Sequence, residues 1–62
     1  MLITLKILGQ RNGVTKARHL DGQEIYIKGM AGVPGQQEKI HDFQKHDRTS
    51  PHYKTLKDRF HS

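Results

Sequence analysis

Two turn dipeptides, Asn12-Gly13 and Asp21-Gly22, divide the first half of the chain into three short segments. Both dipeptides favour the left-handed backbone that two-residue β-hairpin loops require. The outer segments, residues 2–8 and 24–28, alternate apolar and polar side chains, which is typical of half-buried strands. We therefore predict an antiparallel three-stranded meander within residues 1–30.

The middle segment, residues 14–20, fits two structures. Val14, Ala17 and Leu20 recur every third residue, as on a helix, and Gly22 would end such a helix. The turn dipeptides on both sides favour a strand, and we predict one. A β-bulge near Gly9 would re-aim this strand.

The remainder of the chain begins with a breaker-rich stretch from Gly29 to Gly35, which indicates a linker. Residues 36–46 carry only Ile40 and Phe43 at helical spacing, so any helix there would be short and poorly anchored. We expect residues 29–48 to be partly disordered in isolation.

The final segment is predicted to be helical. Tyr53, Leu56 and Phe60 fall along one helical face, and Pro51 suits the first turn after a Thr49 or Ser50 cap. The predicted fold is thus α+β in a single domain. Residues 1–30 form the sheet, and residues 31–62 hold the glycine-rich linker and one or two short helices.

Two-residue loops at both turns would sort the strand residues onto two faces. The apolar face would hold Ile3, Leu5, Ile7, Val14, Leu20, Ile25 and Ile27, which the C-terminal stripe would cover. The opposite face would hold Thr4, Lys6, Thr15, Ala17, His19, Tyr26 and Lys28. This register also places Lys16 and Arg18 on the apolar face, where unpaired cations are too costly to bury. Either they reach an edge, or the register shifts, or they line a second basic surface.

The composition narrows the functional classes. The absence of cysteine excludes disulfides and thiolate zinc sites, and only 32% of the 62 residues are hydrophobic. So few hydrophobic residues build only a small core, which favours a homodimer or an obligate partner. No leader-like or membrane-spanning run is present, so we expect a cytoplasmic protein without a membrane partner. No nucleophile motif stands out, and we expect neither catalysis nor a cofactor.

The net charge of +5 favours an acidic partner. A basic sheet face with one tyrosine suits DNA or RNA, because cations neutralise phosphates and a ring stacks on a base. The sequence therefore predicts a non-catalytic nucleic-acid-binding accessory or regulatory protein. The predicted contacts are Lys6, Arg11, His19, Tyr26 and Lys28, with Lys54, Lys57 and Arg59 on the last helix.

Two alternatives stay open at this point. An inhibitor or adaptor, of the kind found among small phage and accessory proteins, would bind an acidic protein through Tyr53, Leu56 and Phe60 or through a sheet edge. An ordinary solvated sheet face would have no partner. Within the histidine-rich part, Asp42 and His46 would share a helix face as two metal ligands, but His41 points elsewhere and His52 would have to fold back. We assign no metal site.

Overall fold

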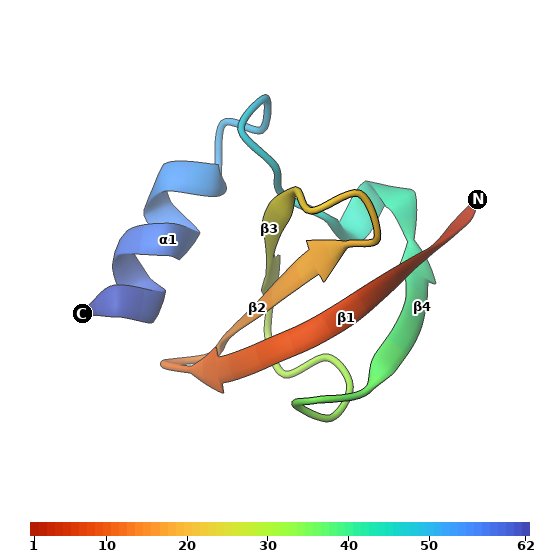
Figure 1. The fold of residues 1–62 in the computed structure, drawn as a ribbon. Helices are drawn as coiled ribbons and strands as arrows, with labels where there is room; N and C mark the ends of the chain where they lie inside the picture. Colours follow the sequence, from red (N-terminus) through yellow and green to blue (C-terminus); the bar gives the residue numbers. More distant parts are fainter.

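The computed structural model describes residues 1–62 and is α+β, with four antiparallel strands and one C-terminal α-helix (Figure 1). The strands are β1 (Leu2–Arg11), β2 (Val14–His19), β3 (Glu24–Lys28) and β4 (Gln37–His41), in the sheet order β3-β2-β1-β4. A 3₁₀ turn, η1 (Asp42–Gln44), and the helix α1 (Tyr53–His61) follow. The predicted fold class is confirmed, and the sheet has one strand more than predicted.

The first hairpin has the predicted two-residue loop. Asn12 and Gly13 both adopt positive φ angles, of 53° and 74°, which defines the type I′ turn that matches strand twist. Beside the turn Arg11 lies opposite Val14, as predicted, but farther along Ile7 lies opposite Ala17. The irregularity between Ile7 and Gly9 is the β-bulge anticipated near Gly9, and it returns Ile7 to the inner face.

The second hairpin differs from the prediction by one residue. Ala17 lies opposite Ile25 rather than Tyr26, because the loop is longer than two residues. His19 accepts a hydrogen bond from the Gly22 N–H at 2.9 Å, and Gly22 has a φ of 98°. This is a three-residue loop that ends in a left-handed glycine, another turn that Asp-Gly favours. The slip moves every β3 side chain to the other face relative to β2.

Residues 37–41 form a strand, not the short helix considered for residues 36–46. β4 pairs with the first half of β1, so that Ile40 lies opposite Ile3. The chain then crosses to the far edge of the sheet, where the backbones of His46 and Tyr26 exchange two hydrogen bonds, of 2.9 and 3.1 Å. The segment after β4 therefore connects the two edge strands of the sheet, β4 and β3.

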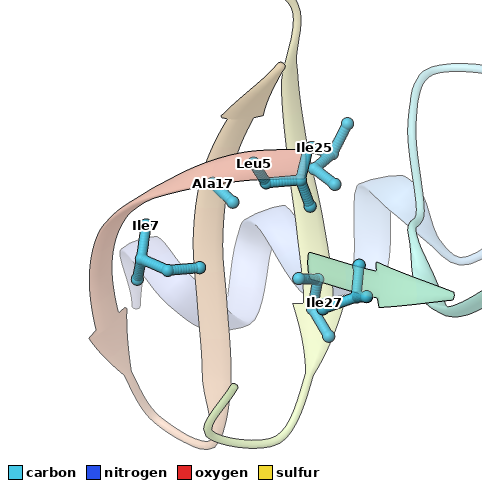
Figure 2. Packing of buried hydrophobic residues seen from close by; sticks show 6 residues of the cluster. Leu5, Ile7, Ala17, Ile25 and Ile27 are labelled. Atoms are coloured by element: carbon cyan, nitrogen blue, oxygen red, sulfur yellow. The ribbon is translucent and has the colours of Figure 1, made fainter. Parts of the chain in front are cut away.

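The main core fills this inner face. It is made of six buried side chains, which Figure 2 shows packed together on the strands: Leu5, Ile7, Ala17, Ile25, Ile27 and Ile40. Thr15 is fully buried beside them and is satisfied by the linker, since its hydroxyl donates to the Gly29 carbonyl and accepts from the Ala31 N–H. The linker therefore closes one end of the core.

A second, smaller core lies on the outer face beneath α1. The helix stripe of Tyr53, Leu56 and Phe60 packs there against Val14 and Tyr26. The prediction that the stripe covers the Ile3–Leu5–Ile7 face is therefore wrong, because the register slip and the bulge turn Val14 and Tyr26 outward. In Figure 1, α1 lies beside β2 and β3, on the opposite side of the molecule from β4.

The two ends of α1 are held by side chains outside it. The helix begins at Tyr53, later than predicted, although the Ser50 hydroxyl still accepts a hydrogen bond from the His52 N–H at 3.3 Å. At the other end the Asn12 amide donates to the carbonyls of Arg59 at 2.9 Å and Ser62 at 3.2 Å. At nine residues and with charged faces, α1 is too short and too polar to cross a membrane.

Asn12→Asp is expected to lower the free energy of unfolding by about 1–2 kcal/mol. Asp-Gly suits the same turn, but a carboxylate beside the Arg59 carbonyl replaces a donor by a negative acceptor at the negative end of a helix. Asn12→Gly, the control, also accepts the positive φ of the turn and removes the hydrogen bonds without adding a charge. Urea unfolding checks this, and an aspartate variant as stable as the glycine variant would contradict the contact.

Candidate nucleic-acid interface

The half of the outer face that α1 leaves uncovered carries three cations on three adjacent strands. Lys6 on β1 lies directly opposite Arg18 on β2. Lys39 on β4 is diagonal to Lys6, because Thr4 faces Lys39 and Lys6 faces Gln37. All three side chains are exposed. Two interstrand spacings separate β4 from β2, so these cations, here called the basic row, span about 10 Å.

No carboxylate neutralises the basic row. The ion pairs of the structure are formed by Lys16 with Glu24 at 3.1 Å and by Lys45 with Asp42 and Asp47. Like charges directly opposite each other on a sheet destabilise it by a few tenths of a kcal/mol, up to about 1 kcal/mol. The unpaired Lys6–Arg18 juxtaposition therefore does not serve stability, and it creates a positive potential over an open surface.

An exposed aromatic side chain stands at the end of the basic row. Phe43 is 78% exposed, and its ring stacks on the His41 ring with a centroid separation of 5.2 Å and an interplanar angle of 20°. His41 follows Lys39 by two residues on the same face of β4. Cations and a stackable ring are thus adjacent on one surface.

The structure separates the eight residues predicted to contact nucleic acid. Lys6 lies in the basic row, while Arg11 and Lys54 are exposed elsewhere, at the first turn and on α1. His19 lies on the inner face opposite Leu5, so its expected place on the basic face is wrong. Lys57 lines a pocket on one side of α1, and Lys28 and Arg59 line a pocket on the other side.

Tyr26 requires the clearest correction. It is 1% exposed, and its ring centroid lies 5.3 Å from that of Tyr53 and 5.8 Å from that of Phe60. It is therefore not a surface ring available for stacking. Its hydroxyl lies 3.2 Å from Nε2 of His61, and burial raises the pKa of the phenol. The slipped register of β3 accounts for the difference, since it places Tyr26 beneath α1.

A polar pocket of about 620 Å³ lies between the β2–β3 hairpin and α1. Its walls carry the cations Lys16, Arg48 and Lys57, with Glu24 as the one carboxylate. Tyr53 lies beneath Lys57, whose Nζ is 6.0 Å from the ring centroid. Glu24 is paired with Lys16, so Arg48 and Lys57 have no carboxylate partner. We call this hollow the helix pocket.

A smaller pocket, of about 250 Å³, contains His46 and His52 on the other side of α1. The two rings are 5.4 Å apart, and His46 Nδ1 lies 2.8 Å from the Ser50 hydroxyl. Burial, followed by the charge of His52, lowers the pKa of His46 below its ordinary value of 6.5, while Asp47 acts weakly in the opposite direction. No group of three His, Asp or Glu side chains lies close enough together to hold a metal ion.

The folded state is expected to lose stability as the pH falls below about 6.5. Because the His46 pKa is lower in the folded chain, the unfolded chain binds the proton first, and the loss levels off once the pH passes the folded pKa. Thermal unfolding at pH 7.5 and pH 5 checks this, with His46→Asn as the control that flattens the dependence. Equal pH dependence in both proteins would contradict the role of His46.

The sequence left the place of Arg18 open and did not point to Lys39, Arg48 or Phe43 as site residues. The apolar-face position of Arg18 followed from the predicted register, although the cost of burying Lys16 and Arg18 already argued against that register. Lys39 was missed because residues 36–46 showed no strand alternation strong enough to identify β4. Arg48 reaches the helix pocket only through the chain's return along β3, which no local pattern predicts.

The comparisons with known proteins give no relative: no protein-family model, curated protein or solved structure matches this chain.

Proposed function

We propose that this chain binds nucleic acid, with the basic row as its principal phosphate-binding surface. The observation that carries the proposal is the unneutralised Lys6–Arg18 pair on an uncovered sheet face, with Lys39 beside it. Three cations without acidic partners match successive phosphates of a strand. The remaining cations, Lys54 among them, contribute at longer range through the net charge of +5.

Phe43 supports a preference for single strands. A ring that is 78% exposed and already held in a stack by His41 offers a flat surface to an unpaired base. Every base has a π-face, so this contact adds affinity without selecting a sequence. Bases within a duplex are stacked on one another and are not available to it.

Protein binding through Tyr53, Leu56 and Phe60 gains no support from the fold. Leu56 is buried and the two aromatic rings pack onto Val14 and Tyr26, so the stripe serves the chain's own core. An acidic partner would instead have to bind the same basic row.

The salt dependence of binding tests the proposal. With three phosphate contacts, affinity for a single-stranded oligonucleotide should fall about 20-fold between 50 and 200 mM salt. Fluorescence anisotropy with a labelled oligonucleotide measures this. An affinity that does not change over this range would exclude binding through the phosphates.

Phe43→Ala is expected to weaken binding of a single strand about 10-fold and to leave binding of a duplex unchanged. Phe43→Trp, the control, keeps a stackable ring and should restore the affinity. An equal loss for both nucleic acids would show that Phe43 does not stack on a base.

A further inference from the structure

The helix pocket differs from the basic row in shape. The basic row is an open face, whereas the helix pocket is a hollow of about 620 Å³ bounded by the β2–β3 hairpin, the chain at Arg48 and α1. This volume is within the range of small-ligand sites. A hollow of this size accommodates a small ligand or the end of a longer one.

The lining of the helix pocket indicates the charge of its ligand. Seven of its nine lining residues are not hydrophobic, which indicates a polar or charged ligand. Arg48 and Lys57 line the hollow without a carboxylate partner. Lys16 is paired with Glu24, with its Nζ 3.1 Å from the carboxylate oxygen. The three cations and Glu24 together give the pocket a net charge of about +2, because two of the three cations have no carboxylate partner.

Directional donors accompany this charge. The Arg48 guanidinium suits planar, two-pronged contacts with phosphate oxygens, and Lys57 supplies a mobile point charge. Tyr53 presents a ring on the same wall, beneath Lys57. A ligand that carries a doubly charged group next to a flat ring would satisfy both the cations and the tyrosine ring.

We propose that the helix pocket binds a phosphate monoester. Such a group carries nearly two negative charges at neutral pH, which matches the two unpaired cations better than the single charge of a diester. Two sources share this chemistry: a free mononucleotide and the phosphorylated end of a strand. The cations of the helix pocket lie outside the basic row, so this proposal does not depend on the proposed function.

Isothermal titration with adenosine 5′-monophosphate, and with adenosine as the probe without phosphate, tests the proposal. The nucleotide should bind and adenosine should not. Lys57→Gln should weaken nucleotide binding about 10-fold, and Arg48→Gln similarly, because each removes one charge-assisted contact. Lys54→Gln is the matched control, since it removes the same charge from the same helix outside the pocket. All three residues are exposed, so folding is preserved.

Absence of nucleotide binding, equal binding of adenosine, or an equal effect of Lys54→Gln and Lys57→Gln would each overturn the proposal. A short strand with a 5′-phosphate, compared with its 5′-hydroxyl form, separates the two sources. A 5′-phosphate that tightens strand binding, and does so less in the Lys57→Gln protein, assigns the pocket to strand ends. A 5′-phosphate that leaves strand binding unchanged assigns the pocket to free nucleotides. Replacement of Lys6, Arg18 and Lys39 should leave mononucleotide binding intact, and its loss there would contradict a separate site.

Discussion

Replacing Lys6, Arg18 and Lys39 together by glutamine is expected to weaken binding of a single-stranded oligonucleotide roughly 100-fold at 50 mM salt. Each lost cation removes one released counterion, so the slope of log affinity against log salt should also fall by about 2. The three side chains are exposed and without ion pairs, so the variant should remain folded. Relief of the Lys6–Arg18 repulsion should stabilise it slightly.

A charge-matched variant isolates the role of the surface. Lys54→Gln, Lys57→Gln and Arg59→Gln together remove the same charge from α1. With a strand that lacks a terminal phosphate, this control should lose only a few-fold in affinity, through the reduced net charge. Equal losses in the two variants would mean that overall charge, and not the basic row, drives binding.

Tyr26→Ala is expected to cost about 3–5 kcal/mol of stability. The side chain is buried beneath α1 between the rings of Tyr53 and Phe60, so its removal leaves a large cavity in the smaller core. Domains below about 70 residues rarely have more than 3–5 kcal/mol of stability, so the variant should be largely unfolded at room temperature. Circular dichroism with urea unfolding measures the effect.

Tyr26→Phe is the control for this substitution. It keeps the ring and loses only the hydroxyl contact with His61, so it should cost about 1 kcal/mol. A well-folded Tyr26→Ala protein that binds nucleic acid more weakly would contradict the structure, because that result requires Tyr26 to be an exposed stacking residue.

The parts of the fold that followed from the sequence are those set by local chemistry. Asn12-Gly13 specified a two-residue loop because both residues accept positive φ, and the alternation of Ile3, Leu5 and Ile7 identified the strand and its buried face. The stripe of Tyr53, Leu56 and Phe60 likewise identified α1. In each case neighbouring residues alone determine the outcome.

The parts of the fold that the sequence did not predict depend on alternatives that a local pattern does not distinguish. Asp21-Gly22 suits both a two-residue and a three-residue loop. The three-residue loop that forms places Tyr26 in the smaller core, whereas a two-residue loop would place it on the basic face. β4 is a strand because it pairs with Leu2–Lys6, far away in the sequence, and its own residues alternate only weakly. That long-range pairing is what places Lys39 and Phe43 beside Lys6 in the candidate site.

Nucleic acid is proposed to bind to the uncovered outer face through the basic row. Titration of the ¹⁵N-labelled protein with a single-stranded oligonucleotide that lacks terminal phosphates, followed by amide chemical shifts, tests it most directly. The largest shift changes are expected to cluster around Lys6, Arg18, Lys39 and Phe43, and added salt should reverse them. Shift changes that avoid this face, or no change at millimolar oligonucleotide, would contradict it.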